Sequence, residues 1–138
     1  MAGTADGPGQ GALDEQGRRT GPWVETFRDG TRSGEGAYDE GTRHGPWRFW
    51  FRNGSLKAVV TYDHGVLVGS GEWFREGGGP LQSGAFESGE QVGLWRRFHP
   101  NGALMDEGTY VAGQRAGTWR HHAPDGALIR TKEHRAPS

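Results

Sequence analysis

The sequence of 138 residues contains no cysteine, which excludes disulfide bonds, cysteine-based zinc sites and thiol catalysis. An excess of charge of one sign is also lacking, because 16 Lys and Arg stand against 17 Asp and Glu. A dedicated nucleic-acid-binding protein usually has a basic excess. The longest purely apolar run, Ala58 to Val60, is far too short to span a membrane. Because the first residues do not join a basic segment to an apolar stretch, we expect no secretory signal and a cytoplasmic protein.

Aliphatic residues are scarce, whereas aromatic residues and glycine are not. Hydrophobic residues make up only 32% of the sequence, yet 11% of the residues are aromatic and 26 are glycine. A disordered chain would lack these aromatic residues, and a compact globular domain would contain more aliphatic ones. This composition predicts a repeat protein with a small aromatic core and glycine in its turns.

A period of 24 residues organises the sequence. Three columns hold 15 of the 26 glycines: Gly17, Gly41, Gly65, Gly89 and Gly113; Gly21, Gly45, Gly69, Gly93 and Gly117; Gly30, Gly54, Gly78, Gly102 and Gly126. Two aromatic columns keep the same period: Trp23, Trp47, Trp95 and Trp119, with Gly71 in the third place, and Tyr38, Tyr62, Phe86 and Tyr110, ending in His134. The period predicts five repeats in residues 14–134, between a flexible arm of residues 1–13 and a tail of residues 135–138.

Each repeat is predicted to be a β-hairpin. Asn-Gly and Asp-Gly pairs such as Asn53-Gly54 favour two-residue type I′ turns, and the flanking segments are rich in β-prone residues. Frequent glycine disfavours any long helix. The sequence therefore predicts an all-β fold: an elongated meander of about ten antiparallel strands in a single-layer twisted sheet, roughly 45 Å wide at about 4.8 Å per strand.

The turn at Asn53-Gly54 sets a register in which Trp47 lies opposite Val60 and, in the fourth repeat, Trp95 lies opposite Gly108. We interpret the glycine as the small partner that a broad indole needs across the hairpin.

The other turn of each repeat is predicted around Glu40-Gly41, which places Trp47 opposite Gly34. Pro22 and Pro46 lie directly before the tryptophan of their repeats and lack the N–H that a central ladder needs. We therefore expect a bulge or a wider loop near these prolines.

Alternation along the strands sorts the side chains into two faces. Face A holds the tryptophan column, the Tyr/Phe column, the leucine column and four further aromatic residues, and we expect it to bury a continuous aromatic ribbon. The last two groups are Leu56, Leu104 and Leu128, and Phe27, Phe49, Phe51 and Trp73. Face B holds Trp50, Phe74, Phe98 and His122, paired across the hairpins with Lys57, Leu81, Met105 and Ile129.

An apolar stripe on face B has two interpretations. A coiled sheet could bury the stripe against itself, or the stripe could face water and mark a partner surface. In the second case the partner-binding residues are an apolar group, which we call the face B stripe, and two flanking arginines. The face B stripe is Trp50, Phe74, Leu81, Phe98 and Met105, and the arginines are Arg48 and Arg96.

No catalytic constellation, cofactor motif or metal site is expected. The sequence lacks the nucleophile-elbow, P-loop and dinucleotide-binding motifs, and its six histidines do not show HExxH spacing. His121 and His122 are adjacent, so on a strand they point to opposite faces. The Gly77-Gly78-Gly79 run is expected to be a flexible hairpin tip.

Nucleic acid is not an expected partner either. The group of Arg48, Trp50 and Arg52 mixes basic and aromatic residues as single-strand binders do. Glu72 and Glu107 dilute that positive charge along the same face.

The repeat consensus, G-x-W-x-x-(aromatic)-x-x-(N/D)-G-x-L-x-x-x-G-x-Y, resembles the bacterial variant of the MORN repeat. The fourth repeat carries it best, in Gly93-Leu94-Trp95, Phe98, Asn101-Gly102-Ala103-Leu104 and Gly108-Thr109-Tyr110, followed by Gly113, Gly117 and Trp119. This resemblance implies meandering β-hairpins that bind proteins or associate with membranes, without catalytic residues. Chains built only of this variant resemble the YwqK-type antitoxin family of bacterial toxin–antitoxin systems.

Together these features predict a non-catalytic protein that binds another protein. The resemblance makes an antitoxin or immunity protein the leading hypothesis, with a toxin as the partner, and a membrane-associating or assembly scaffold the alternative. Arg18, Arg19 and Lys132 lie in the expected edge strands, where basic residues hinder edge pairing. We therefore expect a monomer, with an end-to-end dimer as the other possibility.

Overall fold

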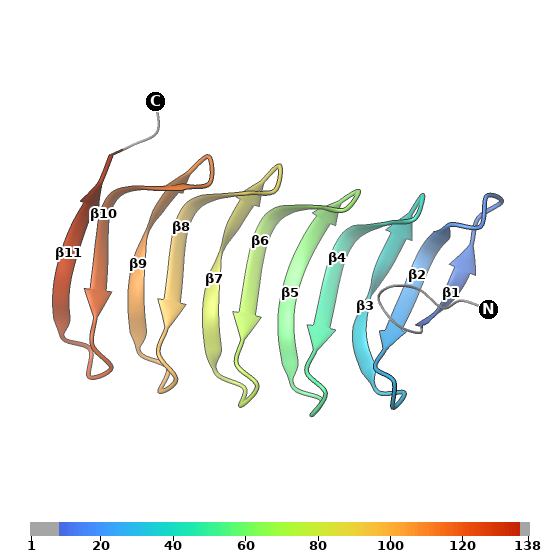
Figure 1. The fold of residues 1–138 in the computed structure, drawn as a ribbon, viewed down its shortest axis with the longest axis horizontal. Helices are drawn as coiled ribbons and strands as arrows, with labels where there is room; N and C mark the ends of the chain where they lie inside the picture. Colours follow the sequence, from blue (N-terminus) through green and yellow to red (C-terminus); the bar gives the residue numbers. More distant parts are fainter. Residues whose placement is uncertain (1–8, 136–138) are drawn as a thin grey trace.

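Residues 9–135, the part of the chain that the computed structural model describes, form eleven antiparallel strands in one open sheet whose order follows the sequence (Figure 1). The strands are β1 (Gly9–Leu13), β2 (Arg19–Thr26), β3 (Arg32–Asp39), β4 (Thr42–Trp50), β5 (Leu56–Asp63), β6 (Val66–Phe74), β7 (Pro80–Glu87), β8 (Glu90–Phe98), β9 (Leu104–Val111), β10 (Gln114–His122) and β11 (Leu128–His134). The predicted all-β single-layer meander is confirmed. Within this described part of the chain, no helix is long and apolar enough to cross a membrane.

Strand β1 is the strand that the prediction of about ten did not include. It lies in the segment expected to be a flexible arm and pairs antiparallel with β2. Gly11 lies beneath the indole of Trp23, whose Nε1–H donates to the carbonyl of Ala12 at 2.9 Å. The first tryptophan thus needs a strand before it, and β1 supplies that strand. Residues 1–8 of the predicted arm and residues 136–138 of the predicted tail lie outside the described residues.

The turns at the upper edge of the sheet in Figure 1, from the β3–β4 turn onward, are the two-residue turns. Their four central pairs share positive φ at both residues, as type I′ turns require. These pairs are Glu40-Gly41, His64-Gly65, Ser88-Gly89 and Ala112-Gly113. The glycine N–H of each of these turns also donates to the preceding repeat, as Gly65 does to the carbonyl of Arg43 at 2.7 Å.

The Asn/Asp-Gly tips at the lower edge are longer than predicted. At the β4–β5 tip the N–H of Phe51 donates to the carbonyl of Ser55, and the N–H of Gly54 donates to the carbonyl of Phe51. Gly54 has φ +91°, whereas Asn53 is not among the residues with positive φ. A type I turn followed by a glycine bulge has this pattern, so the predicted type I′ turn at Asn53-Gly54 is wrong. Asn53 stabilises the tip through its side chain, because its Oδ1 accepts a hydrogen bond from the N–H of Ser55 at 2.9 Å.

The register in the middle of each hairpin is as predicted. Trp47 pairs with Val60, and Trp95 pairs with Gly108. Near the tip the glycine bulge shifts the pairing by one residue, so Trp50 pairs with Leu56 rather than with Lys57.

The predicted pairing of Trp47 with Gly34 is wrong, because Gly34 pairs with Phe49 after a register shift between Glu35 and Ala37. The irregularity expected near Pro46 is therefore present. It recurs between β5 and β6 and between β7 and β8, where Ser70 and Leu94 replace the proline. The bulge is thus a property of the repeat and does not depend on proline.

Each tryptophan of the column lies flat on a glycine of the strand before it. A Cβ atom built on Gly36 would lie 2.4 Å from the indole of Trp47, and one built on Gly84 would lie 2.0 Å from the indole of Trp95. The indole N–H then donates to the next carbonyl along that strand, as Trp47 does to Ala37 at 2.9 Å. Each tryptophan of the column therefore contacts a small partner, as predicted. The glycine that contacts the ring, however, lies on the preceding strand and not across the hairpin.

The third repeat shows how the fold compensates for a missing tryptophan. Gly71 replaces it. On the preceding strand, the position where the other repeats have the glycine that contacts the indole is occupied by Val60. The ring of Trp73 then covers Gly71, stacking on Trp95 at 5.9 Å between ring centroids and meeting Phe86 edge to face at 5.9 Å.

Face A buries the aromatic ribbon that the repeat predicts. Tyr38 meets Trp23 and Trp47 edge to face at 5.9 and 5.3 Å, and Tyr110 meets Trp95 and Trp119 at 5.9 and 5.2 Å. The four tryptophans are at most 3% exposed. Edge-to-face pairs of this kind stabilise a core beyond the burial of their area, so a thin sheet holds its shape without a second layer.

Candidate interaction surface

The face B stripe runs near the lower tips of the hairpins and is not part of the buried core. Trp50, Phe74 and Phe98 are the last residues of β4, β6 and β8, and all three are half-buried. Met105 is also half-buried, and Leu81 is 37% exposed. Because the sheet stays open, it does not bury this face against itself.

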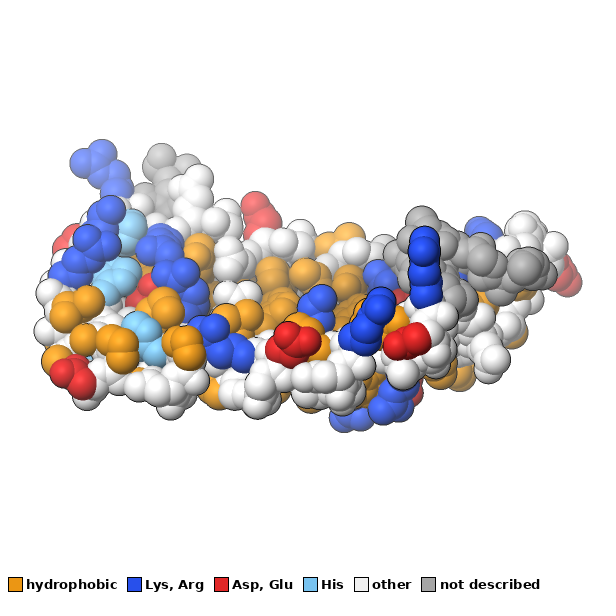
Figure 2. All heavy atoms as spheres, turned by 60° about the horizontal axis from the view of Figure 1, so that its bottom comes forward, with side chains coloured by type: hydrophobic (Ala, Val, Ile, Leu, Met, Phe, Trp, Pro, Cys, Tyr) orange, Lys and Arg blue, Asp and Glu red, His pale blue; other side chains and the backbone are white. Residues whose placement is uncertain are grey.

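The surface seen from the side of the tips is mixed. Figure 2 shows hydrophobic side chains between charged ones along the length of the molecule, with a group beside histidines at the C-terminal end on the left.

The two predicted arginines lie beside the stripe and are exposed. Arg96 Nε donates to Glu107 Oε1 at 3.0 Å, and Arg48 pairs in register with Glu35 across β3 and β4. A third arginine, which sequence reasoning did not select, lies 3.7 Å above the Trp50 ring centroid: Arg32. This cation–π contact orients the indole, and Arg32 Nη1 also donates to Glu35 Oε1 at 3.0 Å.

The stripe extends further toward the C-terminus than the predicted set. Ile129 on β11 is 64% exposed. Ile129 belongs to the same column as Leu81 and Met105, which is the sequence signal that could have added it to the binding residues.

A buried polar network interrupts face A in the first two repeats. The carboxylate of Glu25 accepts bonds from Arg19 Nη1 at 2.9 Å and from Arg43 Nη2 at 2.8 Å, and the hydroxyl of Tyr38 also donates to it. Glu25 is 2% exposed, so the two guanidinium groups compensate for its desolvation. Burial, together with the hydrogen bond and the negative charge of Glu25, raises the pKa of Tyr38 to about 12.

Tyr38 should therefore ionise later than an ordinary tyrosine. An unfolded phenol titrates near about pH 10, so the contribution of Tyr38 to stability is complete below pH 10 and is lost as the pH rises to 12. We expect the absorbance of phenolate to show a late step near pH 12 in the native protein, and Tyr38→Phe to remove that step. The late step surviving in Tyr38→Phe would contradict the assignment.

A second ionic group lies on the last repeats. Asp106 is fully buried, accepts from Arg97 Nε at 2.9 Å and lies 3.5 Å from Nδ1 of His121. Burial lowers the pKa of His121, while the carboxylate of Asp106 opposes that change. The contacts of this group are those of a structural ion pair.

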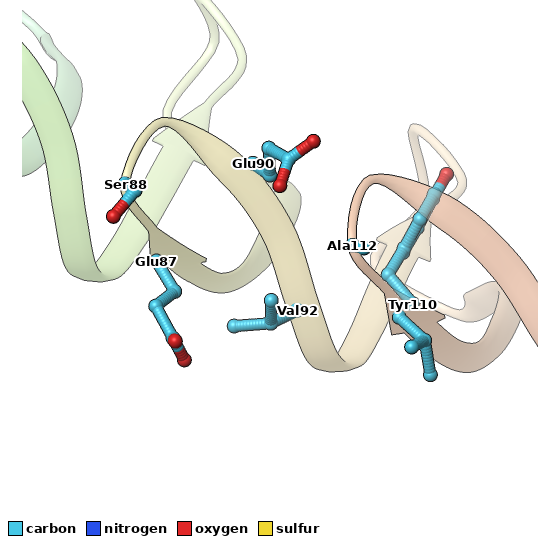
Figure 3. A pocket seen from close by; sticks show the side chains of 7 residues that line it. Glu87, Ser88, Glu90, Val92, Tyr110 and Ala112 are labelled. Carbon is cyan, nitrogen blue, oxygen red and sulfur yellow. The ribbon is translucent and has the colours of Figure 1, made fainter. Parts of the chain in front are cut away.

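Open hollows lie between neighbouring upper turns. One of them, with a volume of about 450 Å³, is lined by Glu87, Ser88, Glu90, Val92, Tyr110, Val111 and Ala112. Figure 3 shows the carboxylates of Glu87 and Glu90 pointing away from each other. They therefore do not form the converging pair that general acid–base catalysis requires.

Histidines converge at one upper turn, although the sequence predicted no metal site. His44, Asp63 and His64 place one possible ligand atom each within 4.8 Å of the others. Hydrogen bonds from His64 to Asp39 and to Asp63 raise the pKa of His64.

Comparison with known families matches residues 43–64 and 91–112. Both segments match the MORN repeat variant. Each matched segment spans one hairpin, β4–β5 or β8–β9, and the two lie 48 residues apart, or two periods. MORN repeats are binding modules. No curated protein matches the chain, so the narrower resemblance to YwqK-type antitoxins is without a match.

Proposed function

We propose that this chain is a non-catalytic MORN-type repeat protein that binds another protein through the face B stripe, flanked by Arg48 and Arg96. The observation that carries the proposal is the position of Trp50, Phe74 and Phe98. They recur once per repeat on a face of the sheet that the fold leaves partly open to water.

The geometry of the stripe suits a flat or extended partner. Successive members are two strands apart, so three rings span about 19 Å along the sheet at about 4.8 Å per strand. Aromatic residues and arginine dominate the binding energy of protein interfaces, whereas lysine and glutamate are depleted there. The stripe supplies the aromatic residues of such an interface, and Arg32, Arg48 and Arg96 supply its arginines. Glu35 and Glu107 lie beside these arginines.

The most specific form of the proposal is a neutraliser, an antitoxin or immunity protein that covers the active surface of a toxin. Its support is the resemblance of the repeat to the antitoxin family. The alternative, a scaffold on membranes or in an assembly, has less support, because an anionic lipid surface attracts clustered basic residues and this chain has a formal net charge of −1.

The test compares a stripe variant with a matched control in native lysate and then with the purified partner. Phe74→Arg/Phe98→Arg should lower affinity at least about 30-fold, which corresponds to about 2 kcal/mol at an interface hot spot. Val66→Arg/Val111→Arg should leave affinity unchanged, because these residues are 44% and 43% exposed and lie at the upper turns.

Thermal unfolding of the same variants distinguishes an interface from a core. We expect the stripe variant to keep its Tm within a few degrees, and Leu81→Glu to weaken binding as a milder second change. A collapse of Tm in both stripe variants would show that face B is core. Retention on anionic vesicles, reversed by salt, would favour the scaffold alternative.

A further inference from the structure

Four side chains with metal-binding chemistry meet at the upper edge of the sheet, on the side away from the stripe. Asp39 ends β3, His44 lies in β4, Asp63 ends β5, and His64 is the first central residue of the β5–β6 turn. His44 Nδ1 lies 3.8 Å and His64 Nδ1 lies 2.8 Å from Asp63 Oδ1. Ligand atoms around a tetrahedral ion with bonds of about 2.0–2.1 Å lie about 3.4 Å apart, so these donors need only small movements.

A second observation points to a metal and not only to a polar cluster. The other ring nitrogen of His64, Nε2, lies 2.8 Å from Asp39 Oδ2. Histidines that bind metals almost always donate this second N–H to a carboxylate, a backbone carbonyl or water, which fixes the tautomer and the ring orientation. Asp39 therefore holds His64 with Nδ1 toward Asp63 and His44.

The repeat provides an internal comparison that separates structure from function here. The column of His44 holds Val68, Val92 and Ala116 in the next three repeats, and the column of His64 holds Ser88 and Ala112. Ser88 and Ala112 have φ of +50° and +49°, close to +46° at His64, so the turn does not require histidine. The fold requires neither imidazole, yet both occur at the same turn.

We propose that His44, Asp63 and His64 form a binding site for a divalent transition-metal ion of the Zn²⁺ class, with Asp39 as the residue that positions His64. Two imidazoles and a carboxylate suit Zn²⁺, Ni²⁺ or Cu²⁺ and not Mg²⁺ or Ca²⁺, which prefer oxygen ligands. The ion takes the place of the proton between His64 Nδ1 and Asp63 Oδ1. It also displaces the 3.2 Å bond from the backbone N–H of His64 to His44 Nδ1.

The site is accessible and incomplete. The side chains of His44, Asp63 and His64 are 44%, 62% and 53% exposed. Three protein ligands leave a fourth position for water or for a donor from another molecule.

Calorimetric titration of the whole chain with ZnSO₄ tests the proposal, and it does not depend on the proposed protein partner. We expect one equivalent of Zn²⁺ to bind, and His44→Val/His64→Ala to abolish this binding. Both substitutions introduce residues that other repeats have in the same columns, so we expect the variant to fold. A thermal melt checks this. Asp39→Asn should weaken binding about 10- to 100-fold, the usual effect of losing such a supporting carboxylate.

His99→Ala is the matched control, because Ala123 occupies its column and His99 lies outside the cluster. It should bind Zn²⁺ as the native chain does. The proposal is wrong if the native chain binds no Zn²⁺, or if the His44→Val/His64→Ala variant binds it equally well.

The second matched hairpin allows the site to be built anew. Val92, Val111 and Ala112 occupy the columns of His44, Asp63 and His64, and Glu87 occupies the column of Asp39 (Figure 3). Val92→His/Val111→Asp/Ala112→His should raise the stoichiometry from one to two equivalents. A folded variant that still binds only one equivalent would show that this arrangement of residues is not sufficient for a site.

Discussion

Gly84→Val should destabilise the protein by about 3 kcal/mol and lower Tm by roughly 10 °C. A Cβ at residue 84 would lie 2.0 Å from the indole of Trp95, far inside van der Waals contact. The ring cannot simply move away, because its Nε1–H donates to the carbonyl of Ala85 at 3.1 Å and its edges meet Phe86 and Tyr110. Thermal and urea unfolding of the purified variant measure the loss.

Gly77→Val is the control for the same chemical change. Gly77 lies at the β6–β7 tip, and no atom lies within 4 Å of a Cβ built there. We expect this variant to unfold within about 0.5 kcal/mol of the native protein. Equal losses of unfolding free energy in the two variants would mean that contact with the tryptophan ring is not the reason for glycine at residue 84.

Trp47→Ala should cost about 3–5 kcal/mol, the range for deleting a buried large aromatic side chain. Trp47 is 0% exposed, contacts Tyr38 and Phe49 through its ring, and donates to the carbonyl of Ala37. Its removal takes away the centre of the N-terminal half of the ribbon and leaves that carbonyl without its indole donor. Urea unfolding followed by far-UV circular dichroism reports the change, because it does not rely on the deleted indole.

Trp50→Ala is the matched comparison, since Trp50 lies three residues away on face B and is only half-buried. We expect it to lose about 1 kcal/mol, an ordinary value for a partly exposed residue. A loss as large as that of Trp47→Ala would place both faces in the core and remove the basis for a partner surface on face B.

The period of 24 residues was sufficient to predict the sheet because each column has a physical role that repeats. The tryptophans, the Tyr/Phe column and the pairing of Trp47 with Val60 follow from alternation and a central register. In the third repeat, Gly71 stands in the tryptophan column and Val60 stands in the column of the glycines that contact the indoles. Both changes are visible in the sequence, 11 residues apart. The predicted pairing of tryptophan with glycine across the hairpin leaves these two changes unconnected, because the glycine that contacts each indole lies on the preceding strand.

Other features depend on geometry that residue types do not specify. Asn-Gly fits both a type I′ turn and a type I turn with a glycine bulge, and the structure uses the second at Asn53-Gly54. Strand β1 lacks the tryptophan and the Asn/Asp-Gly pair that mark most of the repeats, and its glycines resemble those of a flexible arm. His44 and His64 are 20 residues apart in the sequence, so only the pairing of β4 with β5 brings their side chains together.

Footprinting of the complex with its purified partner tests most directly the central claim, that face A holds the fold and face B binds. Hydroxyl radicals label exposed aromatic residues and methionine, and the chain carries both on face B. We predict that binding protects Trp50, Phe74, Phe98 and Met105, while labelling at the upper turns stays unchanged. Protection confined to the upper turns, or no protection of the face B stripe, would contradict the account.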